Sequence, residues 1–137
     1  MELLIRFIVY GIVGLTIETF FRTIGITISK KKFLLEYPPL VMFPIYGISV
    51  FLFEPAHLFF LEKDFPLAIR LAIYVPGLYL IELLTGLLIL RLTGRYVWYY
   101  GGKWQFAHLI NFSYAPFWAV FLFFWEYLHT FMNLLFI

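Results

Sequence analysis

The chain has 137 residues, of which 64% are hydrophobic and 13% are charged, and its formal net charge is +2. Soluble domains carry about 25% charged residues, so a soluble domain of this size would lack a polar surface. The small net charge gives no basis for binding nucleic acid. The absence of cysteine excludes disulfides and thiolate metal sites. We therefore interpret the chain as an all-α, polytopic, multi-pass membrane protein.

Four apolar runs are each long enough to cross a bilayer, because about 20 residues at ~1.5 Å each span the hydrocarbon core. We expect one transmembrane domain over residues 1–137, with helical spans at about residues 3–28, 40–61, 66–92 and 106–130. Pro44 and Pro55 predict kinks in the second span.

The first predicted span has a face of small and charged residues. Gly11, Gly14, Glu18 and Arg22 are spaced 3, 4 and 4 residues apart, which places them on one side of a helix. The glycines favour close approach of a second helix. Glu18 and Arg22 have the i,i+4 spacing at which a carboxylate and a guanidinium pair on one helix.

An acidic residue lies deep in the third predicted span. Glu82 follows Tyr79 by three residues inside a long apolar run, where a carboxylate is expensive and is usually functional. If Glu18 and Glu82 lie at one depth, both cannot ionise cheaply, so one should hold a proton. We expect an intramembrane site for a cation, a proton or a small polar solute, formed by Glu18, Arg22, Tyr46, Tyr79, Glu82 and Asn111. The alternative is a structural polar seam that fixes the register of the helices.

Two parts of the chain repeat a pattern. Pro44 is followed by Glu54 at +10 and His57 at +13, and Pro116 is followed by Glu126 and His129 at the same offsets. Upstream, Ile17-Glu18 corresponds to Ile81-Glu82. These matches predict two tandem two-helix hairpins, related by a pseudo-two-fold axis along the membrane normal.

The same residues allow a metal hypothesis. One Glu on each of two helices and a Glu-x-x-His on each of two others are the ligands of carboxylate-bridged di-iron and di-manganese bundles. The candidate ligands are Glu54, His57, Glu126 and His129, with Glu18 and Glu82 completing the pattern. An offset in depth between the two Glu layers disfavours this site, and so does Pro55. We expect no cofactor, with iron or haem as the alternative.

The basic residues are distributed unequally between the two sides. Seven basic residues lie in or beside the first and third loops. Three lie in or beside the N-terminal segment and the second loop. Because basic residues are enriched on the cytoplasmic side, we expect loops 1 and 3 in the cytoplasm. We expect the cell inner membrane as the location. The seven are Arg22, Lys30, Lys31, Lys32, Arg91, Arg95 and Lys103, and the three are Arg6, Lys63 and Arg70.

Several motifs occur in an order that resembles a known family. They are Gly11 with Glu18, Pro44-x-Tyr46-Gly47, Glu54, Tyr79-x-x-Glu82-x-x-Thr85-Gly86 and Trp98-x-Tyr100. The chain resembles the ABC-transporter type IV (CmpB) family, which includes the transmembrane protein 229 group. The resemblance implies a multi-pass membrane protein without an established substrate. The family's Trp-Asp-Tyr is Trp98-Tyr99-Tyr100 here, and the family pattern has no histidine at His57 or His129.

We predict a transport-related, permease-like component. A bundle of four spans is thin, so we expect membrane lipid, a homodimer or a larger membrane complex as partners. The chain has no GxxxxGK[ST] loop, so an ATPase would be a separate chain. The alternatives are a membrane-embedded metal- or haem-dependent enzyme acting on a lipid or quinone, and an accessory or assembly subunit.

Overall fold

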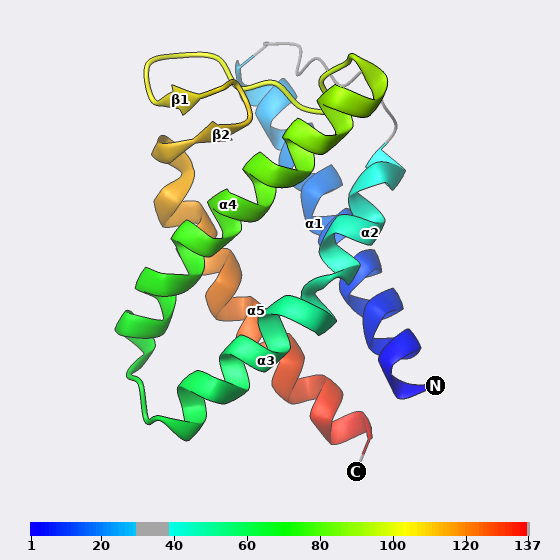
Figure 1. Cartoon of the computed structure of the whole chain (residues 1–137), viewed down its shortest axis with the longest axis vertical. Helices are drawn as coiled ribbons and strands as arrows, with labels where there is room; N and C mark the ends of the chain where they lie inside the picture. The colour runs from blue at the N-terminus through cyan, green and yellow to red at the C-terminus, as the bar shows by residue number, and fades with distance from the viewer. Residues whose placement is uncertain (30–38, 137) are drawn as a thin grey trace.

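The chain is mostly helical, and its long helices lie side by side (Figure 1). The computed structural model describes the backbone of residues 1–29 and 39–136, and the side chains of residues 1–20 and 40–136. The elements in order are α1 (Glu2–Ser29), η1 (Pro39–Val41), α2 (Met42–Gly47), α3 (Ser49–Glu62), α4 (Leu67–Thr93), β1 (Gln105–Phe106), β2 (Ile110–Asn111), η2 (Phe112–Tyr114) and α5 (Ala115–Leu135).

Three of the four predicted spans correspond to helical segments that are long and apolar enough to cross a membrane. These segments are Glu2–Phe20 in α1, Met42–Glu62 across α2 and α3, and Leu67–Thr93 in α4. The helical class and the membrane assignment of the sequence analysis agree with this result. Within the described part of the chain, α5 is not among these candidates.

The second span is interrupted at Ile48, between its two prolines. The Ile48 N–H still donates to the Pro44 carbonyl at 3.0 Å, whereas the Phe51 N–H bonds three residues back, to the Ile48 carbonyl at 2.9 Å. This local tightening separates α2 from α3, and α3 continues through Pro55. In Figure 1, α3 accordingly runs at an angle to α2.

The α-helix of the fourth predicted span begins later than residue 106, because residues 105–111 form a hairpin and residues 112–114 form the 3-10 helix η2. Phe106 instead pairs with Ile110 in a two-stranded antiparallel hairpin. Ala107 and His108 both have positive φ, and the Leu109 N–H donates to the Phe106 carbonyl at 3.1 Å, which closes the turn. The helix begins only at Ala115, directly before Pro116. Proline suits a first turn, where no intrahelical partner for its missing N–H exists.

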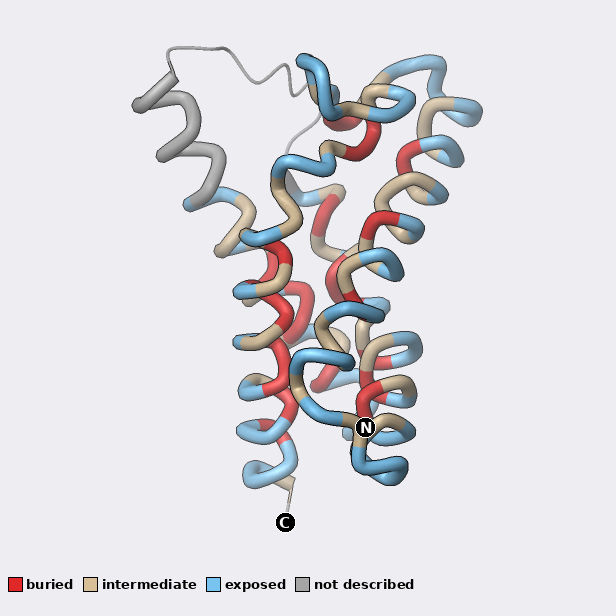
Figure 2. Tube along the Cα trace, turned by 90° about the vertical axis from the view of Figure 1, so that its left-hand side faces the viewer, coloured by how far each residue is buried: buried red, intermediate tan, exposed pale blue. Residues whose placement is uncertain are grey.

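The molecule is apolar outside and partly polar inside. Most buried side chains are aromatic or aliphatic, but Arg6, Glu54, His57, Glu126 and His129 are also buried. Large apolar side chains cover the outward faces of the helices, including that of α5, where Val120, Phe124, Tyr127 and Phe131 are exposed. Figure 2 shows the buried positions along the inner sides of the helices and the exposed ones outside. Such a surface suits lipid better than water.

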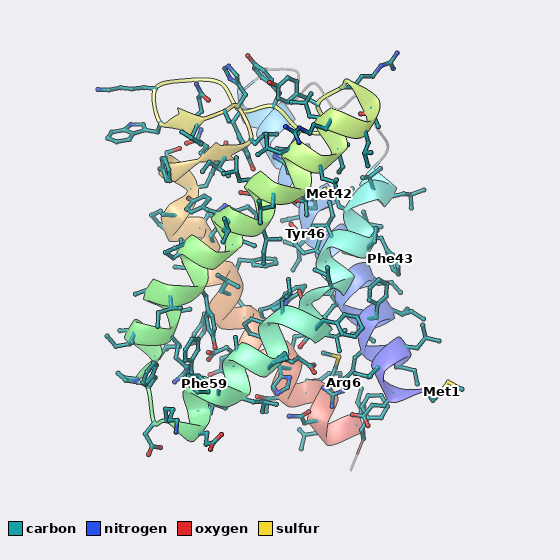
Figure 3. The ribbon with its side chains drawn as sticks, viewed as in Figure 1. Met1, Arg6, Met42, Phe43, Tyr46 and Phe59 are labelled. Carbon is teal, nitrogen blue, oxygen red and sulfur yellow. The ribbon has the colours of Figure 1, made fainter. Side chains whose placement is uncertain are left out.

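Glycines allow α1 and α2 to approach closely, as the sequence predicted. A Cβ atom at Gly11 would lie 2.6 Å from the Phe43 ring, and one at Gly47 would lie 2.8 Å from the Phe7 ring. A Cβ at Gly14 would overlap the base of the Tyr46 side chain. Gly11 and Gly14 therefore leave the room in which Phe43 and Tyr46 of α2, both labelled in Figure 3, pack against α1.

We expect Gly14→Ala to destabilise the protein by roughly 1–3 kcal/mol, because the added methyl group must displace the base of Tyr46. Gly77→Ala is the matched control, since nothing lies within 4 Å of a Cβ atom there. Thermal unfolding of both variants in the same detergent checks the prediction. Equal melting temperatures for the two variants would contradict it.

Candidate functional site

The acidic side chains predicted to face the interior form two separate groups. The first group lies toward the end of the bundle that holds both termini. There, Arg6 Nη1 donates to Glu54 Oε1 at 2.9 Å, and Arg6 Nη2 donates to Asn133 Oδ1 at 2.7 Å. Tyr10 donates its hydroxyl to the same Glu54 oxygen at 2.9 Å. Figure 3 places Arg6 at this end and Tyr46 higher in the bundle.

The second half of the chain makes a matching set of contacts. Arg70 binds Glu126 with two nitrogens, Nε to Oε1 and Nη2 to Oε2, both at 2.8 Å. His57 Nδ1 lies 2.9 Å from the Tyr74 hydroxyl and 3.2 Å from Glu126 Oε1. A bidentate guanidinium–carboxylate pair of this kind is among the stronger polar contacts in proteins.

The histidines exchange partners between the two halves. His57 lies beside Glu126, and His129 Nδ1 lies 3.1 Å from Glu54 Oε1, although that contact falls outside hydrogen-bond geometry. The two imidazole rings meet edge to face, with their centroids 5.1 Å apart. We call this group the charge-paired layer; its members are Arg6, Tyr10, Glu54, His57, Arg70, Tyr74, Glu126 and His129.

In the charge-paired layer each buried carboxylate has an arginine, and Arg6 also pairs through Nε with the carboxylate of Glu2 at 2.9 Å. Two guanidinium groups face two carboxylates, and each carboxylate already accepts bonds from an arginine. The predicted ligands Glu54, His57, Glu126 and His129 do come together, but the arginines compete with a metal for the carboxylate oxygens. Among the described residues, no three of the His, Asp and Glu side chains are arranged so that they could hold one metal ion. Glu18 and Glu82 belong to the other group, so the six-residue ligand pattern is divided.

The second group joins Glu18 and Glu82 through tyrosines. The Tyr46 hydroxyl donates to Glu18 Oε2 at 2.7 Å, and the Tyr100 hydroxyl donates to Glu82 Oε1 at 3.2 Å. Burial, with the nearby Glu82 and Glu18, raises the pKa of the Tyr100 hydroxyl well above its usual value, so this group stays a donor. The two carboxyl groups are also close enough to interact electrostatically. We call Glu18, Tyr46, Glu82 and Tyr100 the acid–tyrosine site.

Among the described side chains, Glu82 differs from Glu54 and Glu126 in having no cation beside it. Its Oε2 is buried and accepts no hydrogen bond, and no arginine or lysine contacts Glu82 among the side chains of residues 1–20 and 40–136. A buried carboxylate without a counter-ion is costly and marks a candidate functional group.

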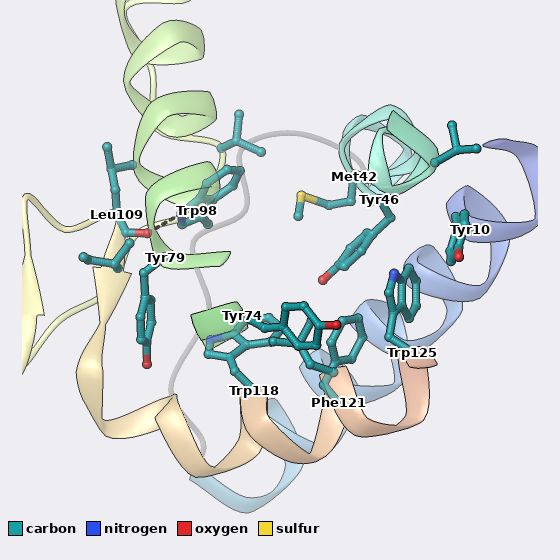
Figure 4. Close-up of a cluster of buried hydrophobic side chains, with 14 of the residues drawn as sticks. Tyr10, Met42, Tyr46, Tyr74, Tyr79, Trp98, Leu109, Trp118, Phe121 and Trp125 are labelled. Atoms are coloured by element: carbon teal, nitrogen blue, oxygen red, sulfur yellow. Dashed lines mark hydrogen bonds between the residues drawn. The ribbon is translucent and has the colours of Figure 1, made fainter. Parts of the chain in front are cut away.

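A cavity of about 200 Å³ opens beside Glu82. It lies between α2 and α3 on one side and α4 and α5 on the other, and its wall is mostly apolar and aromatic. Figure 4 shows Tyr46 pointing into the space between Trp98 and Trp125, two of the aromatic side chains that line the cavity. An apolar pocket with one buried polar group is typical of a small-molecule site.

The remaining predicted site residues lie elsewhere or outside the described side chains. Tyr79 donates its hydroxyl to the backbone carbonyl of Asn111 at 3.0 Å and points away from Tyr46 in Figure 4. The Asn111 side chain accepts bonds from the Ser113 N–H and hydroxyl, which starts the 3-10 turn η2. The Arg22 side chain and Lys30 to Lys32 lie outside the described residues, so the predicted Glu18–Arg22 pair stays a prediction.

Some residues of both groups were missed by the sequence reasoning. Arg6 and Arg70 were counted only as topology determinants, and Tyr10 and Tyr74 were not considered. Each pair is separated by 64 positions, the same separation as Glu18 and Glu82, so extending the repeat upstream would have found them. Helical spacing gives no signal for Tyr100, because its contact with Glu82 depends on how the loop after α4 folds back.

Comparisons with known proteins add nothing to this description. The chain matches no family model, no curated protein and no solved structure. The resemblance to the ABC-transporter type IV (CmpB) family therefore stays a prediction from the motifs.

We expect Arg70→Met to destabilise the protein by about 3 kcal/mol or more, because it leaves the buried Glu126 carboxylate without its cation. The double variant Arg70→Met/Glu126→Gln should lose less stability than the two single changes added together. Unfolding curves in one detergent measure the coupling, with the exposed Lys63→Met as control. Additive losses would show that the pair does not act as a unit.

Proposed function

We propose that the chain is a transport-related membrane component that binds or passes a small polar solute or cation at the acid–tyrosine site. The observation that carries this proposal is the buried Glu82 oxygen without a hydrogen-bond donor, beside a cavity. The charge-paired layer supports the assignment by contrast, since its carboxylates are already neutralised by Arg6 and Arg70. A structural role alone would leave the cost of burying Glu82 uncompensated.

We propose four membrane crossings, with α5 as the fourth. α5 has 21 residues, enough for about 30 Å, and packs along α4. Its outward face is apolar, whereas its inward face carries Glu126 and His129. The N- and C-termini lie at the same end of the bundle in Figure 1, and this supports an even number of crossings.

We also propose that the two halves are related by a pseudo-two-fold axis along the membrane normal. The support is the correspondence of contacts: the Arg6–Glu54 pair in one half matches the Arg70–Glu126 pair in the other. Tyr10 bonds Glu54, and its counterpart Tyr74 bonds His57, which lies beside Glu126. Inverted or parallel repeats of this kind place substrate sites at the repeat interface.

For orientation and partners, we propose the cell inner membrane with loops 1 and 3 in the cytoplasm. The basic residues near the C-terminal end of α4 are Arg91, Arg95 and Lys103. This end of the bundle lies opposite to both chain termini, so the positive-inside rule favours it as the cytoplasmic side. A pathway through so thin a bundle calls for a homodimer or a larger membrane complex. Should the chain belong to an ABC transporter, as the family resemblance implies, the ATPase is another subunit.

We expect Glu82→Gln to reduce solute or cation uptake by proteoliposomes at least tenfold while the protein still inserts and unfolds normally. The amide keeps the shape of the side chain but cannot exchange a proton or neutralise a cation. Uptake is measured for a panel of small inorganic cations, alkylammonium ions and neutral polar solutes. Glu62→Gln, at an exposed carboxylate, is the matched control. Unchanged uptake of every panel member in Glu82→Gln would exclude the proposed site.

A further inference from the structure

We infer that the cavity beside Glu82 binds an organic monocation in which an ammonium group is joined to an apolar body. The inference rests on the proposed function and gives that function a substrate class. It places the ammonium group at Glu82 and the apolar body between α3 and α4. Four features of the cavity carry it: its charge, its aromatic wall, its size and its opening toward lipid.

The charge of the site selects a cation. Glu82 Oε2 is buried and accepts no hydrogen bond, and no described basic side chain compensates Glu82. Elsewhere in the same interior, Glu54 and Glu126 each have an arginine. A positively charged ligand would therefore supply at Glu82 what Arg6 and Arg70 supply in the charge-paired layer.

The aromatic wall selects an organic ammonium group. Tyr46, Trp98, Trp118 and Trp125 all line the cavity, together with Glu82 itself. Trp98 packs against Gly86, one helical turn beyond Glu82, where a Cβ atom would lie 3.1 Å from its ring. The faces of indole and phenol rings attract ammonium groups, and several such rings around one carboxylate form a typical ammonium site.

The size and polarity of the cavity select a small apolar body. A volume of about 200 Å³ is somewhat larger than an engineered apolar cavity of roughly 150 Å³ that binds benzene. It therefore suits a group of one ring or a short branched chain. A hydrated inorganic ion or a polyol would lose hydrogen bonds to water that this wall cannot replace.

The cavity reaches the lipid-facing surface. Ile48 and Leu52 on one side and Ile73 and Gly77 on the other line it and are exposed. A ligand with an apolar body concentrates in the bilayer and can enter by this route, between α3 and α4. A Cβ atom at Gly77 would have nothing within 4 Å, so this position keeps the entrance open without supporting the fold.

Binding of a fixed positive charge should release a proton. Before binding, a carboxyl group without a counter-ion in hydrocarbon is expected to be neutral. The carboxylic acid then loses one proton as the cation arrives, and the product is a carboxylate–ammonium pair. The charge of the site is the same before and after, and no covalent bond of the ligand changes.

The test uses benzyltrimethylammonium and its uncharged isostere neopentylbenzene, with wild-type protein in lipid nanodiscs. Binding is followed by tryptophan fluorescence, because Trp98, Trp118 and Trp125 line the cavity. Calorimetry in two buffers that differ in ionisation enthalpy counts released protons. We expect the cation to bind at least tenfold more tightly than the isostere, when both dissociation constants are expressed as ligand concentrations in the lipid. Binding of the cation should release about one proton. Tetramethylammonium, which lacks the apolar body, should bind more weakly.

Two variants separate charge from space. Glu82→Gln should abolish the preference for the cation and the proton release, while neopentylbenzene binds as before. Gly77→Leu should fill the entrance and weaken the binding of both ligands at least tenfold. Its unfolding temperature should be unchanged or slightly higher than that of the wild type. Equal affinity of wild type for the two ligands, or a preference retained in Glu82→Gln, would overturn the inference.

The result can be distinguished from failure of the proposed function. If benzyltrimethylammonium does not bind, but uptake of an inorganic cation or a polar solute still depends on Glu82, the substrate class is wrong and the site stands. If Glu82→Gln changes neither ligand binding nor the uptake of any panel member, both proposals fall together.

Discussion

A carboxylate held away from water must meet a cation, a proton or a set of hydrogen-bond donors, and this requirement organises the structure. The helices present apolar side chains outward, so every charged group that is not at an end has to find its partner inside. Arg6 of α1 pairs with Glu54 of α3, and Arg70 of α4 pairs with Glu126 of α5. The histidines cross between these pairs, with His57 beside Glu126 and His129 beside Glu54. These contacts join α1, α3, α4 and α5 at one level of the bundle.

The same requirement has a different outcome at the opposite end. Among the described side chains, Glu82 meets the Tyr100 hydroxyl, which donates a hydrogen bond but brings no positive charge. Glu82 also lines a cavity, and neither Glu54 nor Glu126 is among the residues that line that cavity. The bundle thus combines a polar layer whose carboxylates pair with arginines and a second polar group in which Glu82 borders a cavity. This difference, more than the presence of acidic residues as such, separates a structural from a functional interpretation.

Much of this arrangement follows from sequence spacing, because helices repeat regularly. The positions of Gly11, Gly14, Glu18 and Glu82 on inward faces, and the meeting of Glu54, His57, Glu126 and His129, are consequences of the 3.6-residue period. The hairpin at residues 105–111 could not be predicted in this way. Its turn uses positive φ at Ala107 and His108, residues that give no turn signal, and the apolar run from Phe106 looks like the start of a helix.

Tyr79 and Tyr100 illustrate a second limit. Spacing correctly places Tyr79 and Glu82 on neighbouring turns of α4, but the hydroxyl of Tyr79 reaches Asn111 in the hairpin. Tyr100, 18 residues beyond Glu82, takes the position at the carboxylate because the intervening loop returns over the helix end. The path of this loop is set by contacts distant in sequence. Leu109 packs against Gly86, and the Trp98 indole N–H donates to the Leu109 carbonyl. The period of a helix contains no information about such contacts.

The exchange of histidines between the two halves has a consequence for how such a chain could arise. Residues up to Glu62 supply Arg6, Glu54 and His57, but the histidine beside Glu54 comes from the other half. A short protein with only two such helices would leave that place empty, and a second copy of itself would fill it. The contacts are therefore those that a paired, half-length ancestor would already need, and fusion of the two copies would turn an association between molecules into one within a single chain.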